Sequence, residues 1–381
     1  MRNRWLEAGL PKTKKTGAAA DKRGYTRMGR WLSFAFRPAD SWLHCVAAVG
    51  VLLAASATLA RGADEPRQIF AREYFHTFAH NNAVLERIKP GEVIFTRTLD
   101  SGGQDEKSEH RSQPSNPLTG PFYVEGAEKG DAIAVHFRKV RLNRNWGYSV
   151  WRLALISLTP DSIESLYSDK YKPDLVRKGS QRLVPWDIDL AHGTLRLREP
   201  ASKRVLLEFP VHPMLGCVGV AAPGEFVPTS GPAGSYGGNL DYNEIGEGAT
   251  VILPVYHPGA LLFVGDGHAL MADGEPTGTG VETSMDVEFS VDLVKKAKVN
   301  GPRVETADYL ISVGAQPEFE SSLDRALQLA TTDMVEWLAN DYQMEPWAAH
   351  MLVGFAGKYD VVTVQGTMAL RIPKRYLPAR P

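Results

Sequence analysis

Alternation of apolar and polar side chains with a period of two is the feature that most constrains this chain. Ile133, Val135 and Phe137 take every second position of Ala132–Leu142, and a similar pattern runs through Val281–Leu293. Strict alternation is typical of β-strands that bury one face and expose the other. The chain must therefore build sheets whose apolar faces cover one another.

Shorter strands are predicted at Thr194–Leu197, Arg204–Val211, Thr250–Tyr256, Ala260–Val264 and Ala307–Val313. Gly, Pro, Asn and Asp separate these segments, and the chain contains 35 Gly and 25 Pro. Many short strands with such punctuation favour a β-sandwich or a β-barrel. We therefore predict a mainly β fold, with a β-rich domain over residues 66–320.

Two segments near the C-terminus have a helical pattern instead. Ser322–Tyr342 carries an apolar stripe, with Ser321 or Ser322 available as the N-cap. Glu345–Phe355 has Pro346 in its first turn, where proline is tolerated. We predict a helical pair within residues 321–381, packed on the same domain and followed by a final strand over Val361–Ile372.

Residues 1–60 are predicted to be a basic leader with a secretory signal. They hold ten Lys or Arg and three Asp or Glu, and an apolar run fills positions 42–60. Small residues near the end of the run offer cleavage points. We expect export to the periplasm or beyond, with a mature start between residues 56 and 66. The alternative is a retained anchor, which would be the one membrane association of the chain.

The remaining residues carry 33 basic and 41 acidic side chains. Nucleic-acid binding needs a basic patch, so this acidic balance argues against it and is compatible with a cation site. Cys217 is the single cysteine beyond the leader, and its small apolar neighbours predict a buried, inert thiol.

Polar residues gather in four Gly-rich places, at residues 75–82, 98–104, 237–243 and 265–282. In the last of them, Asp266 and His268 are two positions apart, so on an extended strand they face the same side. An imidazole beside carboxylates suits zinc or a similar ion, although a tight turn with solvated charges fits the spacing too. His76 and His80 would share one face of a helix, or one or both would simply be packed or solvated.

Motifs for a nucleophilic serine or for phosphate binding are absent from the sequence: neither a GxSxG elbow nor a Walker loop occurs. Any hydrolysis by such a chain would then depend on a metal-activated water and a proton-carrying carboxylate.

Several strings together resemble the acetamidase/formamidase family. They are TLDSGGQ (98–104), NPLTGPFYVEGAEKGD (116–131), HPMLGCVGVAAPGE (212–225), GGNLDYN (237–243) and PGALLFVGDGHALMADGEPTGTGVE (258–282). They keep the family's order within about residues 70–375. The resemblance implies a β-sandwich, jelly-roll-like core with a smaller α/β part.

The resemblance also implies site residues. It implies a metal site drawn from His80, Asp100, Asp241 and His268, with Glu282 as a further carboxylate. It singles out Glu125 as a buried acid that moves protons, while a solvated Glu125 at a turn is the alternative. We therefore predict Glu125 and Glu282 as catalytic residues. Zinc is the expected metal, and calcium the second choice.

The predicted function is metal-dependent hydrolysis of short-chain amides such as formamide or acetamide, which releases a carboxylate and ammonia. The alternative is a periplasmic metal-binding or ligand-binding protein that keeps the amidase fold without turnover. The expected partner is the small amide, and we expect a homodimer.

Overall fold

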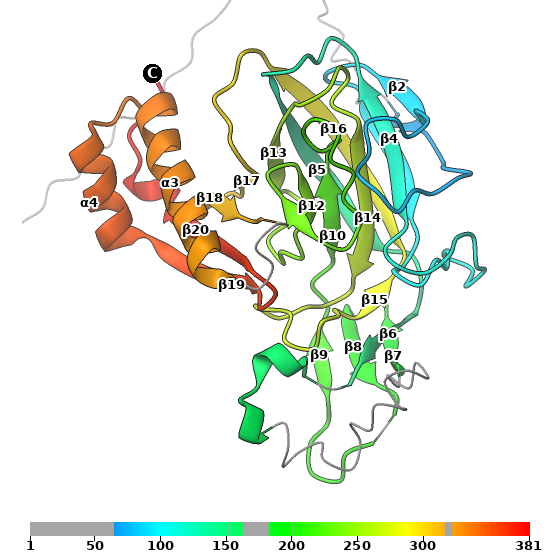
Figure 1. Ribbon diagram of the computed structural model, residues 1–381. Helices are drawn as coiled ribbons and strands as arrows, with labels where there is room; N and C mark the ends of the chain where they lie inside the picture. Colours follow the sequence, from blue (N-terminus) through cyan, green and yellow to red (C-terminus); the bar gives the residue numbers. More distant parts are fainter. Residues whose placement is uncertain (1–64, 152, 163–182, 200, 317–321) are drawn as a thin grey trace, which may run out of the picture. The chain divides into compact units, whose positions relative to one another are not determined.

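The alternating segments pair into two β-sheets in the computed structural model (Figure 1), which describes residues 65–151, 153–162, 183–199, 201–316 and 322–381. The chain divides into two units, Met1–Ala60 and Arg61–Pro381, and the described residues belong to the second. The predicted leader lies outside them. None of the described helices is long and apolar enough to cross a membrane.

Nine strands form the first sheet within this part of the chain, in the order β1-β3-β16-β5-β13-β17-β18-β20-β19. Their bounds are β1 Arg67–Gln68, β3 Val93–Thr98, β5 Ala132–Leu142, β13 Thr250–Pro254, β16 Met285–Val294, β17 Arg303–Glu305, β18 Tyr309–Gly314, β19 Lys358–Thr363 and β20 Thr367–Pro373. All but the β1–β3 contact are antiparallel.

The second sheet follows the order β11-β12-β10-β14-β15-β6-β7-β8-β9, and β4 joins it by pairing with both β14 and β2. The bounds are β2 Glu86–Ile88, β4 Leu118–Val124, β6 Trp146–Val150, β7 Leu183–Asp189, β8 Thr194–Leu197, β9 Glu208–Pro210, β10 Met214–Gly219, β11 Ala233–Gly234, β12 Gly237–Asn239, β14 Leu262–His268 and β15 Glu282–Thr283. Strands β6 to β9 form a ribbon that extends below the two facing sheets (Figure 1).

Apolar side chains from both sheets share one core. Phe289 on β16 packs edge-on against Phe122 on β4, with ring centroids 5.3 Å apart. Both side chains are fully buried, as are Val135 on β5 and Phe263 on β14. The mainly β fold expected from the alternation is thereby confirmed.

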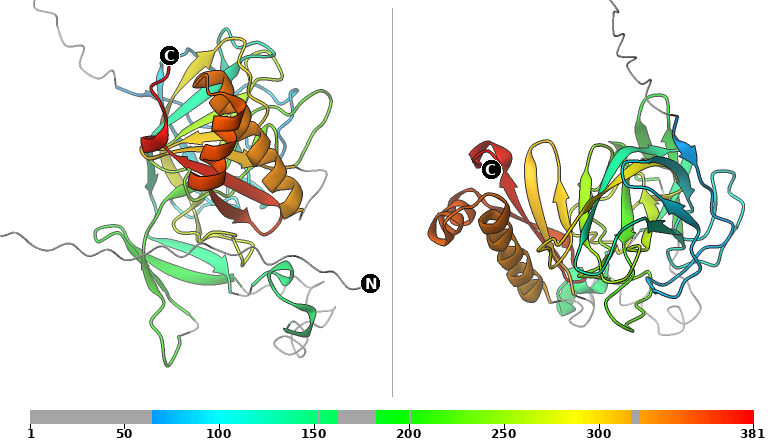
Figure 2. Two further views of the ribbon diagram at one scale, coloured as in Figure 1. Left: turned by 90° about the vertical axis from the view of Figure 1, so that its left-hand side faces the viewer. Right: turned by 90° about the horizontal axis from the view of Figure 1, so that it is seen from above.

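The C-terminal helical pair is confirmed as well, as α3 Leu323–Asp341 and α4 Pro346–Ala356. Ser322 caps α3, because its Oγ accepts a hydrogen bond from the backbone N–H of Arg325. A second apolar cluster joins α3 to β18 and β20, and Figure 2 shows both helices beside these strands. Two 3₁₀ turns, η1 Leu155–Ser157 and η3 Lys374–Tyr376, also lie in the described part of the chain.

Four strand predictions were wrong in their bounds. Val281–Leu293 is two strands, because the chain changes sheets at Ser284 between β15 and β16. Val361–Ile372 is a hairpin that turns at Gly366, whose φ is +117°. Arg204–Val211 is reduced to the three residues of β9.

The fourth difference matters for the site. The strand predicted at Ala260–Val264 begins at Leu262 and continues to His268, because Ala260 and Leu261 have φ values of 58° and 61°. The GDGH string therefore lies within β14 and not in a loop. Side chains on this strand have a fixed direction, which the site uses.

Candidate active site

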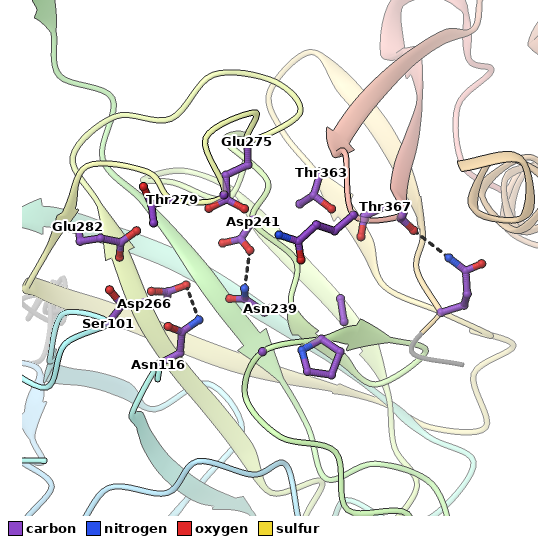
Figure 3. A pocket seen from close by; sticks show the side chains of 17 residues that line it. Ser101, Asn116, Asn239, Asp241, Asp266, Glu275, Thr279, Glu282, Thr363 and Thr367 are labelled. Atoms are coloured by element: carbon purple, nitrogen blue, oxygen red, sulfur yellow. Dashed lines mark hydrogen bonds between the residues drawn. The ribbon is translucent and has the colours of Figure 1, made fainter. Parts of the chain in front are cut away.

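A cavity of about 240 Å³ lies where the second sheet meets the hairpin between β19 and β20 (Figure 3). Its lining comes from segments spread over most of the chain: Ser101, Asn116, Gly231, Pro232, Ala233, Asn239, Asp241, Asp266, Glu275, Gly278, Thr279, Glu282, Gln316, Thr363, Gln365, Gly366 and Thr367. Most of these side chains are polar, and four are carboxylates.

Strand register brings an imidazole to these carboxylates. His268 and Glu282 are directly opposite each other on β14 and β15, which places His268 Nε2 3.2 Å from Glu282 Oε1. Asp266 lies two positions before His268 on the same face, with its Oδ2 3.6 Å from Nε2. Asp241 Oδ1 lies 4.0 Å from the same nitrogen. We call these four residues and Glu275 the acidic cluster.

Backbone strain accompanies the cluster. Asp241, Asp266 and Glu275 have φ values of 45°, 56° and 42°, in the left-handed region that non-glycine residues rarely adopt. Gly216 on β10 makes room for two of them, since a Cβ at this position would collide with the carboxylates of Asp241 and Asp266. Strain of this kind persists only where the surroundings enforce it, and it is concentrated at functional sites.

Two amide side chains orient the carboxylates through hydrogen bonds. Asn116 donates from Nδ2 to Asp266 Oδ2 over 3.1 Å. Asn239 donates from Nδ2 to Asp241 Oδ2, and its own Oδ1 accepts from the thiol of Cys217 over 2.9 Å. Cys217 is fully buried, and burial raises the pKa of its thiol, so the thiol stays protonated and donates.

Burial sets the protonation of the acidic cluster. Burial, reinforced by the neighbouring carboxylates, raises the pKa of Asp241 well above its usual value and that of Glu275 to about 8. Burial also raises the pKa of Glu282. Burial lowers the pKa of His268, but the charges of Glu282 and Asp266 outweigh it and raise that pKa overall. Without a cation the cluster therefore holds protons, and a bound cation would replace those on the carboxyls that coordinate it.

The donor atoms of the cluster suit such a cation. Ligand atoms of Asp241, His268 and Glu275, and likewise of Asp266, His268 and Glu282, lie within 4.8 Å of one another. Within the acidic cluster, four buried atoms have no hydrogen-bond partner: Asp241 Oδ1, Asp266 Oδ1, His268 Nδ1 and Glu282 Oε2. Unpartnered buried acceptors are costly unless a ligand satisfies them, so the residues present fit a divalent metal ion.

Three of the residues predicted for the site meet in this cluster, namely Asp241, His268 and Glu282. The same-side geometry predicted for Asp266 and His268 is also present. The other three predicted residues lie apart from the cluster. Their positions follow from contacts that sequence spacing does not reveal.

Asp100 is fully buried in an ion pair with Arg144, whose Nη2 lies 2.7 Å from Asp100 Oδ2. Its other oxygen accepts from the backbone N–H of Gln104. Both oxygens are therefore engaged, and Asp100 holds the loop from which Ser101 reaches the cavity. This arrangement leaves Asp100 a supporting role behind the site.

His80 stacks on His257, with ring centroids 4.8 Å apart, and its Nε2 lies 3.8 Å from Glu225 Oε2. The segment around it is irregular, so the helix that would align His76 with His80 does not form. His76 contacts the carbonyl oxygen of Ser115 and the hydroxyl of Ser112 instead.

Glu125 lies in the turn after β4 and is partly exposed, and it does not line the cavity. This is the turn position that the sequence left open as the alternative. The acid expected to be buried at position 125 is found instead at Glu275 and Glu282.

Several cavity residues were not predicted. Asn116 and Asn239 lie inside strings that carry the family resemblance, so those strings were the available signal. Thr363, Gln365 and Thr367 come from the C-terminal hairpin, about 80 residues beyond the nearest predicted site residue in the sequence. No local pattern marks them as cavity residues.

Comparison with known proteins confirms the family resemblance. Residues 200–353 match the Acetamidase/Formamidase family. A protein of Schizosaccharomyces pombe that is provisionally named a formamidase is 25% identical over 255 residues, which cover 56% of this chain and 61% of the relative. The chain therefore matches less than two thirds of that relative's length.

Solved structures match over more of their length. An acetamidase from Yersinia enterocolitica is 28% identical with a TM-score of 0.67, covering 83% of this chain and 94% of the other. A predicted acetamidase/formamidase from Thermoanaerobacter tengcongensis is also 28% identical, with a TM-score of 0.63 and coverage of 81% and 96%.

Proposed function

We propose that this chain, which resembles the acetamidase/formamidase family, hydrolyses small amides to a carboxylate and ammonia. The observation that carries the proposal is the acidic cluster around His268 at the wall of a polar cavity. All five residues of the acidic cluster lie within the segment that matches the family. Amides need both carbonyl activation and protonation of the leaving nitrogen, and the cluster offers groups suited to each task.

We further propose that Asp241, Asp266 and His268 hold a divalent ion, with Glu275 and Glu282 at its edge. The presence of an imidazole favours zinc over calcium, which prefers oxygen ligands alone. Such an ion would polarise the amide carbonyl and lower the pKa of a water molecule at the site.

The chain's own residues would move the protons. Glu275 has a pKa of about 8, so its carboxyl carries a proton near neutral pH and can donate it to the departing nitrogen. Glu282 contacts His268 and lines the cavity, which suits it to accept a proton from the attacking water. Asn116 and Asn239 keep the neighbouring carboxylates oriented while this happens.

Two matched variants test these assignments. Glu282→Gln keeps the shape and removes the titrating carboxyl, so kcat for acetamide should fall about 10²–10⁴-fold. Glu125→Gln changes the partly exposed carboxylate outside the cavity, and its kcat should stay near the wild-type value. Ammonia release measured for both proteins, with metal analysis of the same samples, distinguishes them. The opposite ranking would return the proton transfer to Glu125.

The same experiment separates the enzyme from a binding protein. Metal bound in stoichiometric amount without ammonia release from any of a panel of amides would overturn the enzymatic proposal. It would support the non-catalytic alternative in its place.

We also propose that the protein is exported, on the strength of the basic leader and the apolar run at positions 42–60. N-terminal sequencing of the protein from its native cell should find a start between residues 56 and 66. An intact start at Met1, or at Met28 if translation begins at this second methionine, in the soluble cytoplasm would contradict export. A homodimer stays a prediction, which sedimentation of the purified protein can check.

A further inference from the structure

One wall of the cavity is formed by residues that do not belong to the acidic cluster. Thr363 and Thr367 are directly opposite each other across the β19–β20 hairpin, and both are buried. Figure 3 shows them on the side of the cavity away from Ser101, Asn116 and Glu282. Gln365, in the turn between them, lines the cavity too.

Backbone contacts fix this wall relative to the cluster. The backbone N–H of Gly274 donates to Val362 O, and Val364 donates back to Gly274 O over 2.8 Å. Glu275 follows Gly274 directly, so the loop that carries this carboxyl is tied to the hairpin. Gln316 donates from Nε2 to Gly366 O over 2.9 Å and holds the turn. These hydrogen bonds therefore hold the wall at a fixed position relative to the acidic cluster.

The space between the two walls exceeds the needs of acetamide. The cavity of about 240 Å³ has room for about eight water-sized groups, taking ~30 Å³ for each. Acetamide has four non-hydrogen atoms. A substrate whose amide reaches the acidic cluster could thus extend a longer acyl chain towards Thr363 and Thr367.

The residues that line the cavity determine which charge and polarity of the acyl chain it can bind. None of the described residues around the cavity is Lys, Arg or aromatic, and Pro232 and Ala233 are the largest apolar side chains among them. An acyl chain with a carboxylate would meet acidic side chains and no Lys or Arg side chain along the lining. An alkyl or aryl chain would leave the hydroxyls and amide of the hairpin without partners.

We propose that the preferred substrate is a neutral primary amide whose acyl chain carries a hydroxyl or a second carboxamide, bound by Thr363, Gln365 and Thr367. This assignment rests on the proposed amidase function and names its substrate class. The reaction is the same hydrolysis, in which the hydroxyl group of water replaces the amino group at the carbonyl carbon and ammonia is released.

A panel of amides of similar size tests the assignment on the intact, metal-loaded enzyme. Lactamide and malonamide carry the expected polar groups, butyramide is their apolar counterpart, and succinamate adds a negative charge. We expect kcat/KM for lactamide and malonamide to exceed that for butyramide at least about 10-fold. Succinamate should be the poorest substrate.

Isosteric variants locate the effect. Thr363→Val and Thr367→Val each remove one hydroxyl at nearly constant volume, and each should lower the ratio of kcat/KM for lactamide to that for butyramide about 10-fold. Thr194→Val, on β8 outside the cavity, should leave the ratio and the activity unchanged. Because two separate positions are tested, failure of one variant to fold leaves the other to decide.

The outcomes separate the two proposals. The substrate class is overturned if the enzyme hydrolyses amides but prefers butyramide. It is also overturned if a folded Thr363 or Thr367 variant keeps the wild-type ratio of kcat/KM for lactamide to that for butyramide. Either result leaves the amidase function standing. Hydrolysis of no amide at all overturns both.

Discussion

Gly216 has no reactive group, yet it determines where two reactive groups lie. A methyl group at this position would collide with the carboxylates of Asp241 and Asp266. We expect Gly216→Ala to push these side chains away from His268 and lower kcat/KM about 10²-fold, because displacements of about 1 Å have effects of this size.

Gly354→Ala is the matched control. A Cβ at Gly354, on the exposed side of α4, meets nothing within 4 Å. Its activity should equal that of the wild type. Steady-state kinetics and bound-metal content of both variants check the prediction, and a fully active Gly216→Ala protein would contradict it.

The raised pKa of Glu275 predicts that the stability of the metal-free protein depends on pH. Its pKa is raised by burial from 4.5 to about 8, so the folded state keeps a proton that the unfolded chain releases. The stability from Glu275 is therefore fully present below about pH 4.5 and is lost as pH rises through about 8.

Thermal melting of chelator-treated protein between pH 5 and 8.5 measures this loss. The Tm of the wild type should fall relative to that of Glu275→Gln as the pH rises, because glutamine does not titrate. Parallel Tm curves for the two proteins would show that Glu275 ionises at its ordinary pH.

At the scale of elements, periodicity predicted the features that depend on one helix or strand alone. The apolar stripe and the cap at Ser322 gave α3 to within a residue or two, because both are properties of a single helix. The break at Ser284 was missed because alternation continues through it while the strand changes sheets. Side-chain period reveals a strand but not its partner.

The same limit explains the site. Asp266 and His268 share a strand, so their spacing predicted their common face. Glu282 meets His268 through strand register, and the loop that carries Glu275 is joined to the hairpin by the bridge between Gly274 and Thr363. Asp100 was assigned as a ligand from the family resemblance, and its ion pair with Arg144 could not be foreseen because the two residues are 44 positions apart in the sequence. Such contacts are fixed by tertiary structure alone.

Helix α3 is tied to β17 by a buried ion pair, which gives a prediction at this scale. Arg303 donates from Nε and Nη2 to the two oxygens of Asp333, and both residues are buried. Asp333→Ala would leave the guanidinium buried and unpaired, so we expect the free energy of unfolding to fall by about 3–5 kcal/mol.

Chemical denaturation of Asp333→Ala and of Gln328→Ala, an exposed position of the same helix, measures the difference. The Gln328 variant should lie within about 0.5 kcal/mol of the wild type. Equal stability of the two variants would mean that the ion pair is dispensable.

At the scale of the whole molecule, the acidic cluster couples the fold to its proposed ion. Three of the four buried carboxylates have an unpartnered oxygen, which is unfavourable without a cation, so metal bound to the folded state should stabilise it. A ligand present at 100 times its Kd adds about 2.7 kcal/mol to the free energy of unfolding. Removal of the metal should therefore lower the Tm by on the order of 5 °C.

Elemental analysis and melting curves of the same samples test this coupling. We expect one or two divalent ions per chain, and the Tm of chelated protein should recover as zinc is titrated back, because only the folded cluster brings these ligands together. The double variant Asp241→Ala/His268→Ala removes two ligands of the cluster, so it should hold no metal and its Tm should not respond to zinc or chelator. A chelated wild-type protein that is free of metal, fully active and unchanged in Tm would refute the metal site, and the amidase would then have to work through its carboxyl groups alone.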